Sequence, residues 1–270
     1  MKGLLLGMLA ETSIHPGMGQ AQSVIDLPVA REATTGYPMI PGSSLKGVLR
    51  DKVREEKGKE LAEVLFGKSE SIGGMGVTDA RLLLLPVRSL SRHYQWVTCP
   101  YLLERFVRDT SLIDYSISID DISVESGEAI VGQEDNSIFL EEFSFRGNHQ
   151  PDFINQLAEC ILPLIRHESV RKRLSRQLVV ISDEKFGHMA RYSLPVQARN
   201  VLDDVTKTSK NLWYEETIPP DTVMYSLLLE RPGKEELLAD LKTLLEAKPY
   251  LQVGGNETIG QGWFITTMVE

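Results

Sequence analysis

The fold is decided by one C-terminal stretch, TVMYSLLLERPGKEELLADLKTLLEAKPYLQVGGNETIGQGWFITTMV, residues 222–269. It holds an apolar run of strand length, a Pro-Gly break, an amphipathic helical pattern over residues 234–248, and two strand-like runs around a glycine loop. The N-terminal part repeats this order, with an apolar run at residues 2–10, a helical pattern from residue 43 and a strand-like run at residues 77–89. Strand, helix, strand at both ends predicts an α+β, ferredoxin-like fold of βαβ units with long insertions.

Two long segments show neither the helical nor the strand period. The first, about residues 11–44, is rich in Gly, Pro, Ser and Thr, and irregular stretches of that length in a compact protein are usually functional or disordered. The second, about residues 183–211, mixes aromatic, Met and basic side chains. Since neither a short repeat nor a low-complexity linker divides the sequence, we expect a single domain over residues 1–270.

The charge balance argues against a general binder of polyanions. The 270 residues include 38 acidic and 29 basic side chains, which gives a net charge of −9. Domains that bind mainly by neutralising phosphates are usually basic, although a local basic groove stays open as an alternative. Cys99 and Cys160 are too few for a disulfide framework or a four-thiolate zinc site, which favours reduced thiols and a cytoplasmic location.

The N-terminal residues favour a buried first strand over a signal peptide. The apolar run at residues 2–10 is followed directly by Glu11 and His15, and no small-residue cleavage pattern is evident. Elsewhere no apolar stretch reaches the ~18 residues that a membrane span needs. We therefore expect no membrane partner.

The helical pattern that begins near Ser43 is apolar on one face and cationic on the other. Its apolar positions are Leu45, Val48, Leu49 and Val53. Its cationic positions are Lys46, Arg50, Arg54 and Lys57. Free amides of Gly42, Ser43 and Ser44 at the helix start, beside this charge, would suit a phosphate. The alternative is an ordinary capped helix with a solvated basic face.

The C-terminal glycine loop GGNETIGQG contains Gly254, Gly255 and Gly260. It is not a P-loop, because Gln261 and Gly262 stand where Lys and Ser or Thr would be needed. Glycines between two apolar runs more often indicate a tight connection or a close contact with another chain's backbone. Nucleoside triphosphate binding therefore has no support here.

Four polar residues could carry chemistry, and each has an ordinary interpretation when judged alone. Asp26 could form a turn, His15 could be structural, and Glu215 and Glu216 could be solvated. No H-E-x-x-H, C-x-x-C or G-x-S-x-G motif occurs, so zinc peptidases, redox thiols and α/β-hydrolases are not supported.

The second irregular segment has a composition that suits contact with RNA. Side chains such as Phe186 and Met189 in an extended loop can wedge between bases while Arg191 and Arg199 hold phosphates. The alternative is a surface loop that folds back on the core.

Eight motifs spread along the chain point to one family. They are HPGMG (15–19), IDLPVARE (25–32), TGYPMIPGSSLKGVLR (35–50), LFG (65–67), TDARLLLLPVRS (78–89), WVTCP (96–100), LWYEE (212–216) and GGNETIGQG (254–262). Together they resemble the RAMP proteins of CRISPR effector complexes, and within them the repeated backbone subunit of the type III-B (Cmr) complex. The glycine loop marks only the superfamily, whereas IPGSSLKG and WVTCP are similar to this subunit in particular.

The resemblance implies a modified RRM-like palm with a thumb β-hairpin, which would correspond to residues 183–211. It implies that copies of the chain stack as a filament along a guide RNA, pair it with a target RNA and contact other Cmr subunits. Met189 or a neighbour would be the wedge at the kinked bases, with Arg191 among the RNA contacts. The remaining RNA contacts implied by the resemblance are Ser43, Ser44, Lys46, Arg50, Arg54, Gly254, Gly255 and Gly260.

The resemblance also implies an endoribonuclease that is active only in the assembled complex. Asp26 matches the position needed for target cleavage, and His15, Glu215 and Glu216 are similar to residues near the scissile phosphate. A carboxylate is a weak base at neutral pH, so Asp26 would orient the attacking 2′-hydroxyl or bind a divalent metal, Mg²⁺ or Mn²⁺, with none tightly bound. One carboxylate is an incomplete metal site. A scaffold without catalysis and a guide-processing endoribonuclease stay open as alternatives.

Overall fold

The computed structural model of the chain describes residues 2–19, 24–231 and 237–270. Four antiparallel strands form its centre, in the spatial order β16, β1, β14, β6. Along the chain these are the fourth, first, third and second strands of a β-α-β-β-α-β unit, so the predicted ferredoxin-like, α+β palm is confirmed. The palm elements are β1 (Gly3–Ala10), α1 (Gly42–Lys57), α2 (Lys59–Phe66), β5 (Met75–Val77), β6 (Ala80–Arg88), β14 (Val223–Glu230), α8 (Leu237–Ala247), β15 (Tyr250–Gln252) and β16 (Trp263–Val269).

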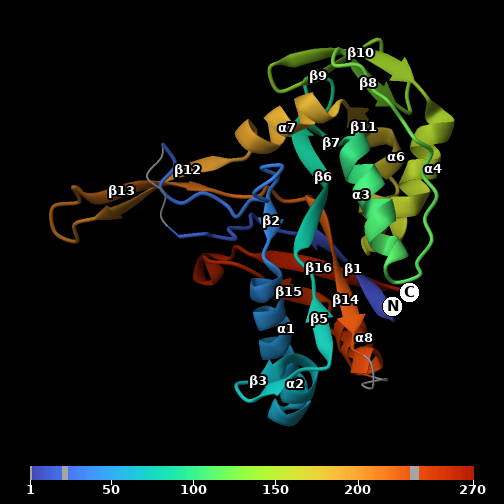
Figure 1. Ribbon diagram of the computed structural model, residues 1–270. Coiled ribbons are helices and arrows are strands. Elements are labelled where there is room, and N and C mark those ends of the chain that lie inside the picture. The colour runs from blue at the N-terminus through green and yellow to red at the C-terminus, as the bar shows by residue number, and fades with distance from the viewer. Residues whose placement is uncertain (1, 20–23, 232–236) are drawn as a thin grey trace.

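Strand alternation in β1 explains how both faces of this sheet become buried. Leu4, Leu6 and Met8 point to the core beneath α1 and α8, whereas Leu5 and Leu9 point to the opposite core. In an RRM this second face is where bases stack. Here α3 (Pro100–Ser111), α4 (Pro151–Ile161) and η1 (Leu162–Leu164) cover it (Figure 1). This face is therefore not open as it is in an RRM.

The sheet continues beyond β6 into an inserted layer, in the order β7, β11, β8, β10, β9. Its strands are β7 (Tyr94–Thr98), β8 (Glu128–Val131), β9 (Ser137–Leu140), β10 (Phe143–His149) and β11 (Leu178–Ile181). The helices that follow or flank it are α5 (Glu168–Arg171), α6 (Leu174–Gln177) and α7 (Asp183–Tyr192). Short elements complete the chain: β2 (Met39–Ile40), β3 (Gly67–Lys68), β4 (Ser71–Ile72) and η2 (Glu257–Ile259).

A two-stranded hairpin, β12 (Val196–Leu202) and β13 (Ser209–Glu216), projects from the body of the molecule (Figure 1). Its tip is closed by Asp203, whose carboxylate accepts hydrogen bonds from the amides of Thr206 (2.8 Å) and Val205 (2.9 Å). These amides, with the ammonium of Lys210, hold the pKa of Asp203 well below its usual range. The tip is thus a formed turn.

The hairpin spans residues 196–216, so its expected bounds, about 183–211, are wrong at both ends. Residues 183–192 form helix α7, because Ser182 caps its start and Phe186, Met189 and Ala190 bury one helical face. The hairpin begins only at Val196. By contrast, the insertion expected over residues 11–44 is irregular apart from β2 and the start of α1, with residues 20–23 outside the described residues. The helix expected over 234–248 is seen as α8, and its first three residues also lie outside them.

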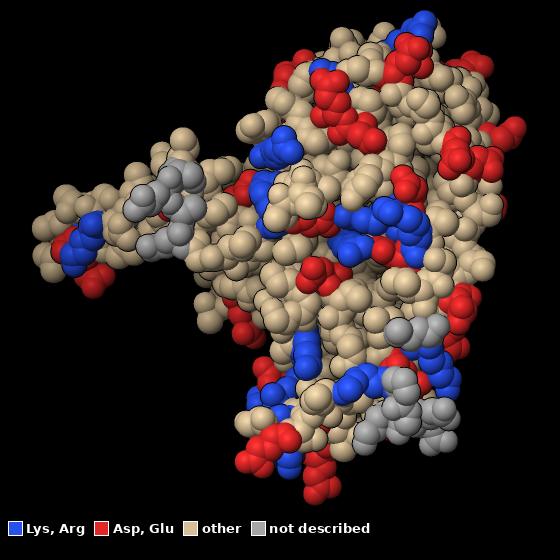
Figure 2. Space-filling view, viewed as in Figure 1, with Lys and Arg blue, Asp and Glu red and all other residues tan. Residues whose placement is uncertain are grey.

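Basic side chains gather locally even though the chain as a whole is acidic. Figure 2 shows a group of Lys and Arg side chains in the middle of the face seen, between α3 and β6, and others beside acidic residues around α1. A net charge of −9 therefore does not preclude a basic surface. None of the described helices is long and apolar enough to cross a membrane.

The core beneath α3 gives a stability prediction. Phe106 is fully buried and packs edge-on against Tyr225, with ring centroids 4.9 Å apart. Phe106→Ala is expected to lower the free energy of unfolding by about 3–5 kcal/mol, because removal of the ring leaves a cavity. Denaturant unfolding measures it, with Phe139→Ala as control, since Phe139 is 38% exposed. Equal destabilisation of both variants would contradict the assigned packing.

Candidate functional site

Four segments that are distant in sequence meet at the base of the hairpin. Backbone pairing joins Ile14 to Ile218, Gly17 to Val29, and Leu27 to Glu215. The C-terminal glycine loop joins them, because the amide of Gly255 donates to the carbonyl of His15 over 3.0 Å. These contacts unite three of the motifs singled out above, HPGMG, IDLPVARE and LWYEE, with GGNETIGQG.

Asp26 is held against the free edge of β13. Its Oδ2 accepts a hydrogen bond from the amide of Tyr214 over 2.8 Å. The next residue, Leu27, donates its amide to the carbonyl of Tyr214 (3.1 Å) and accepts from the amide of Glu216 (3.0 Å). The Asp26 segment thus adds a short strand to the hairpin, and its half-buried carboxylate has a fixed place at the rim.

His15 is fixed on the same edge of β13. Its Nδ1 lies 2.8 Å from the carbonyl oxygen of Glu216. A carbonyl can only accept, so Nδ1 carries the proton and Nε2 of the neutral ring has a free lone pair. Gly17 leaves room beside Nε2, where a Cβ would approach to 3.0 Å. The two β13 groups that hold Asp26 and His15 lie two residues apart, roughly 7 Å along a strand.

Glu215 and Glu216 are buried, so the interpretation of both as solvated is wrong. They are 3% and 2% exposed. Glu216 accepts from Arg31 Nη2 (2.6 Å) and from the amide of Val29 (3.0 Å). Glu215 accepts from the amide group of Asn256 and lies 3.8 Å from Arg199. Both carboxylates are committed to partners inside the chain, so neither is free to act at a scissile phosphate.

The glycine loop supports His15 by close approach. Gly254 has φ +91°, and a Cβ there would lie 2.5 Å from the carbonyl oxygen of His15. Gly260 also has a positive φ, +80°, but the space around it is open. The close backbone contact seen here is made within the chain, by Gly254 with His15, and not with another chain's backbone, which the glycine pattern also suggests.

On α1 the side chains rather than the amides are available to an anion. The amide of Gly42 already donates to Asp79 (2.7 Å) and that of Ser44 to Pro41 (2.9 Å), so the phosphate site expected at these amides is largely filled. Ser43 and Ser44 have exposed side chains. Lys46 and Arg50 have no ion-pair partner among the described residues, and they line a cavity of about 530 Å³ beside β3 and β4. Arg54, in contrast, pairs with Asp51 over 3.0 Å.

The expectation that Met189 wedges between bases is wrong, because Met189 is fully buried in the core. Arg191 lies near the surface and donates to the carbonyl of Thr35 over 3.0 Å. The hairpin presents a group of apolar side chains to solvent, whereas on α7 Tyr192, at the end of the helix, is exposed. The hairpin side chains are Val196, Val201, Leu202, Val205, Leu212 and Tyr214, each at least 45% exposed.

Asp26 does not form a metal site with other side chains of the described residues. Nowhere in those parts of the chain do three His, Cys, Asp or Glu residues come together as a ligand set. One oxygen of Asp26 is already bound to an amide. The side chains of the described residues by themselves therefore do not fit a resident metal.

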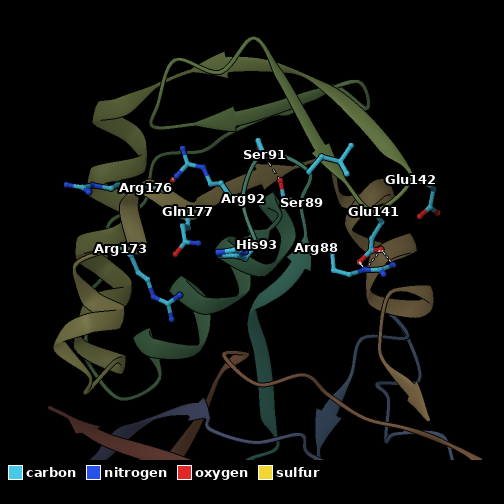
Figure 3. A pocket seen from close by; sticks show the side chains of 11 residues that line it. Arg88, Ser89, Ser91, Arg92, His93, Glu141, Glu142, Arg173, Arg176 and Gln177 are labelled. Atoms are coloured by element: carbon cyan, nitrogen blue, oxygen red, sulfur yellow. Dashed lines mark hydrogen bonds and ion pairs between the residues drawn. The ribbon is translucent and has the colours of Figure 1, made fainter. Parts of the chain in front are cut away.

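A large cavity lies elsewhere, at the turn between β6 and β7 (Figure 3). Its volume is about 1110 Å³, and it is lined by arginines that have partners in the chain: Arg88 pairs with Glu141, and Arg173 lies over the ring of Trp96 at 4.9 Å. No residue expected from the sequence to act on RNA lines it. The Asp26 site is an open rim at a strand edge, which suits a long polymer better than a small molecule.

Comparison with known proteins matches this architecture to one family. The model of the RAMP superfamily matches residues 8–265. The chain belongs to the RAMP superfamily. It is 36% identical to the RAMP protein "CRISPR system Cmr endoribonuclease Cmr4" of Pyrococcus furiosus, covering 100% of this chain and 97% of that protein. The resemblance inferred from the motifs is confirmed.

Solved structures agree with this RAMP assignment. The crystal structure of oligomeric Cmr4 from Pyrococcus furiosus superposes with a TM-score of 0.82 at 32% identity, covering 100% of this chain and 98% of that one. A subunit in the cryo-EM structure of the type III-B Cmr-beta complex bound to cognate target RNA shares the fold, with a TM-score of 0.79 at 22% identity and coverage of 99% and 97%.

The sequence interpretation missed two residues of this RAMP site. Arg31 and Asn256 bind the two buried glutamates, from positions 185 and 41 residues away in sequence. Both lie inside motifs that were singled out, IDLPVARE and GGNETIGQG. The signal that could have found them is a charged or amide side chain among the apolar or glycine positions of a motif.

Proposed function

We propose that this RAMP chain is the backbone subunit of a type III-B CRISPR complex. Copies coat the guide RNA as a helical filament, together with other Cmr subunits, and cleave the paired target RNA at regular intervals. Its full-length relative from Pyrococcus furiosus is named a Cmr endoribonuclease, and a related crystal structure is described as oligomeric. The observation that carries the proposal is that Asp26 and His15 share one open edge at the base of a projecting hairpin.

The hairpin provides the reason for assembly. Six large apolar side chains on it are each at least 45% exposed to solvent. Apolar and aromatic side chains in such a position can separate stacked bases and hold a nucleotide out of the duplex. A flipped nucleotide next to the hairpin base would bring its ribose to the rim formed by β13.

Cleavage then follows from in-line geometry. The 2′-hydroxyl of the flipped nucleotide attacks the adjacent phosphorus, the O2′–P bond forms, the P–O5′ bond breaks, and a cyclic phosphate and a 5′-hydroxyl result. Asp26 accepts a hydrogen bond from the 2′-hydroxyl and orients it, which supplies much of the acceleration in such reactions. His15 Nε2 takes up the proton that the 2′-hydroxyl releases as the O2′–P bond forms, and it returns a proton to O5′ as the P–O5′ bond breaks. A divalent ion, Mg²⁺ or Mn²⁺, would add charge stabilisation if RNA phosphates completed its ligand set.

The alternatives are less well supported. A pure scaffold has no use for a carboxylate and an imidazole fixed on one rim. A guide-processing endoribonuclease would act as an isolated chain, and incubation of that chain with precursor repeat RNA tests it directly. We further infer a cytoplasmic location, where the RNA substrates and reduced Cys99 and Cys160 would both be found.

Guide binding is tested at α1. The double variant Lys46→Ala with Arg50→Ala is expected to weaken guide-RNA binding and to reduce the slope of log K against log salt by roughly 0.7 for each phosphate that the variant no longer neutralises. Fluorescence anisotropy of labelled guide RNA over a salt series measures both. Lys59→Ala is the control, because Lys59 on α2 is paired with Glu63. Identical salt slopes for the double variant and the unmodified chain would refute this role.

A further inference from the structure

Arg31 connects three separate parts of the molecule. It follows Asp26 by five residues in the same insertion. Its Nη1 donates to the carbonyls of Gly36 (2.9 Å) and Ala190 (2.7 Å), and its Nη2 donates to Glu216 Oε1 (2.6 Å). The planar guanidinium thus ties the insertion to the last turn of α7 and to the base of the hairpin, an arrangement that no other side chain type can reproduce.

Glu216, the partner of Arg31, contacts His15 and the segment that carries Asp26. Its carbonyl accepts from His15 Nδ1, and its amide donates to Leu27, the residue after Asp26. Its Oε2 accepts from the amide of Val29 over 3.0 Å. The carbonyl, the amide and Oε2 of Glu216 therefore bind His15 or the residues just after Asp26, and Oε1 binds Arg31.

The pair of Arg31 and Glu216 is partly closed off from water. The side chain of Glu216 is 3% exposed and that of Arg31 is 21% exposed. A buried carboxylate that loses its cation must either find a new partner or move toward solvent. Because the main chain of Glu216 carries His15 and Leu27, such a movement would displace both. The effect of Arg31 would thus reach the reacting atoms through geometry alone.

From these contacts we propose that Arg31 is a positioning residue for RNA cleavage. Through Glu216 it sets the distance between Asp26 and His15, and it couples that distance to the position of the hairpin base. The inference rests on the proposed function, since it presumes that Asp26 and His15 act on RNA. It also reassigns Glu216 from a group at the scissile phosphate to the link between them.

The experiment uses the assembled complex with guide RNA and a labelled target. Single-turnover cleavage rates and target affinity are measured for Arg31→Ala, Arg31→Lys and Arg171→Ala. Arg171 is the matched control, because it also donates to two carbonyls, of Leu162 and Ile165, and pairs with a glutamate, Glu168. Each complex is assayed with and without millimolar guanidinium chloride, against sodium chloride at equal ionic strength.

Arg31→Ala is expected to cleave about 100-fold more slowly with unchanged target affinity, as small misplacements of reacting groups can cause. Guanidinium should restore part of this rate and should not affect Arg171→Ala, which should cleave normally. Arg31→Lys keeps the charge but cannot reach three acceptors in one plane, so an intermediate rate is expected, and this variant decides the matter if Arg31→Ala does not assemble.

Normal cleavage by Arg31→Ala or Arg31→Lys would overturn the inference. So would an equally slow rate in Arg171→Ala, because the effect would then be one of general stability. An Asp26→Asn complex assayed in parallel distinguishes a failure of the proposed function from a failure of the positioning role alone. If that complex cleaves normally, the proposed function itself fails, whereas if it is inactive and the Arg31 variants are normal, only the positioning role fails.

Discussion

Asp26→Asn is expected to abolish target cleavage while the complex still assembles and binds its target. Asparagine is nearly isosteric, and its Oδ1 can still accept from the amide of Tyr214, so the loop should keep its place. The change removes the negative charge and turns one acceptor oxygen into an NH2 donor. If the carboxylate orients the 2′-hydroxyl, the cleavage rate should fall by about 100-fold or more.

Denaturing gels of labelled target measure the rate, and electrophoretic mobility shift of the complex measures target binding. Asp204→Asn is the control, because Asp204 is an exposed carboxylate near the hairpin tip. It removes the same charge from the same hairpin without touching the rim. Unchanged cleavage products from Asp26→Asn would favour the pure scaffold, whereas a loss of target binding would indicate that Asp26 holds RNA and does not promote its cleavage.

Local sequence patterns were sufficient for the palm. The apolar alternation of β1 and the helical spacing of Leu45, Leu49 and Val53 depend on neighbours a few residues away, and both elements lie where those patterns predict them. The same reasoning failed at residues 183–192, although the signals of a helix were present. These signals are Ser182 as N-cap, acidic residues in the first turn, and Phe186 three residues before Met189. The segment was nevertheless interpreted as irregular, because no helical period was apparent over its whole length.

The candidate site could be predicted from the sequence only in part. Asp26 and His15 could be singled out because they stand in distinctive motifs. The state of Glu215 and Glu216 could not be predicted, since adjacent residues of a strand normally face opposite sides and a glutamate without a partner would avoid burial. Both are buried because Arg31 and Asn256 arrive from distant segments. A single sequence does not specify such pairings, whose partners are 41 to 185 residues apart.

Gly254→Ala is expected to reduce cleavage strongly, by about 10- to 100-fold, through displacement of His15. Two effects combine at this position. A φ of +91° disfavours any side chain, and the new Cβ would lie 2.5 Å from the carbonyl oxygen of His15, which the amide of Gly255 now binds. The His15 backbone must move, and the hydrogen bond between Nδ1 and Glu216 must weaken with it.

Gly260→Ala separates these two effects, because Gly260 has a similar φ of +80° and nothing within 4 Å of the position of its Cβ. Both variants should lose roughly 1–2 kcal/mol of stability from backbone strain alone. Only Gly254→Ala should lose cleavage, since only there does the added methyl group meet His15. Thermal melts measure the loss of stability in the two variants, and single-turnover assays measure their cleavage rates. If both variants cleave equally well, the contact between Gly254 and His15 supports the loop and has no part in the reaction.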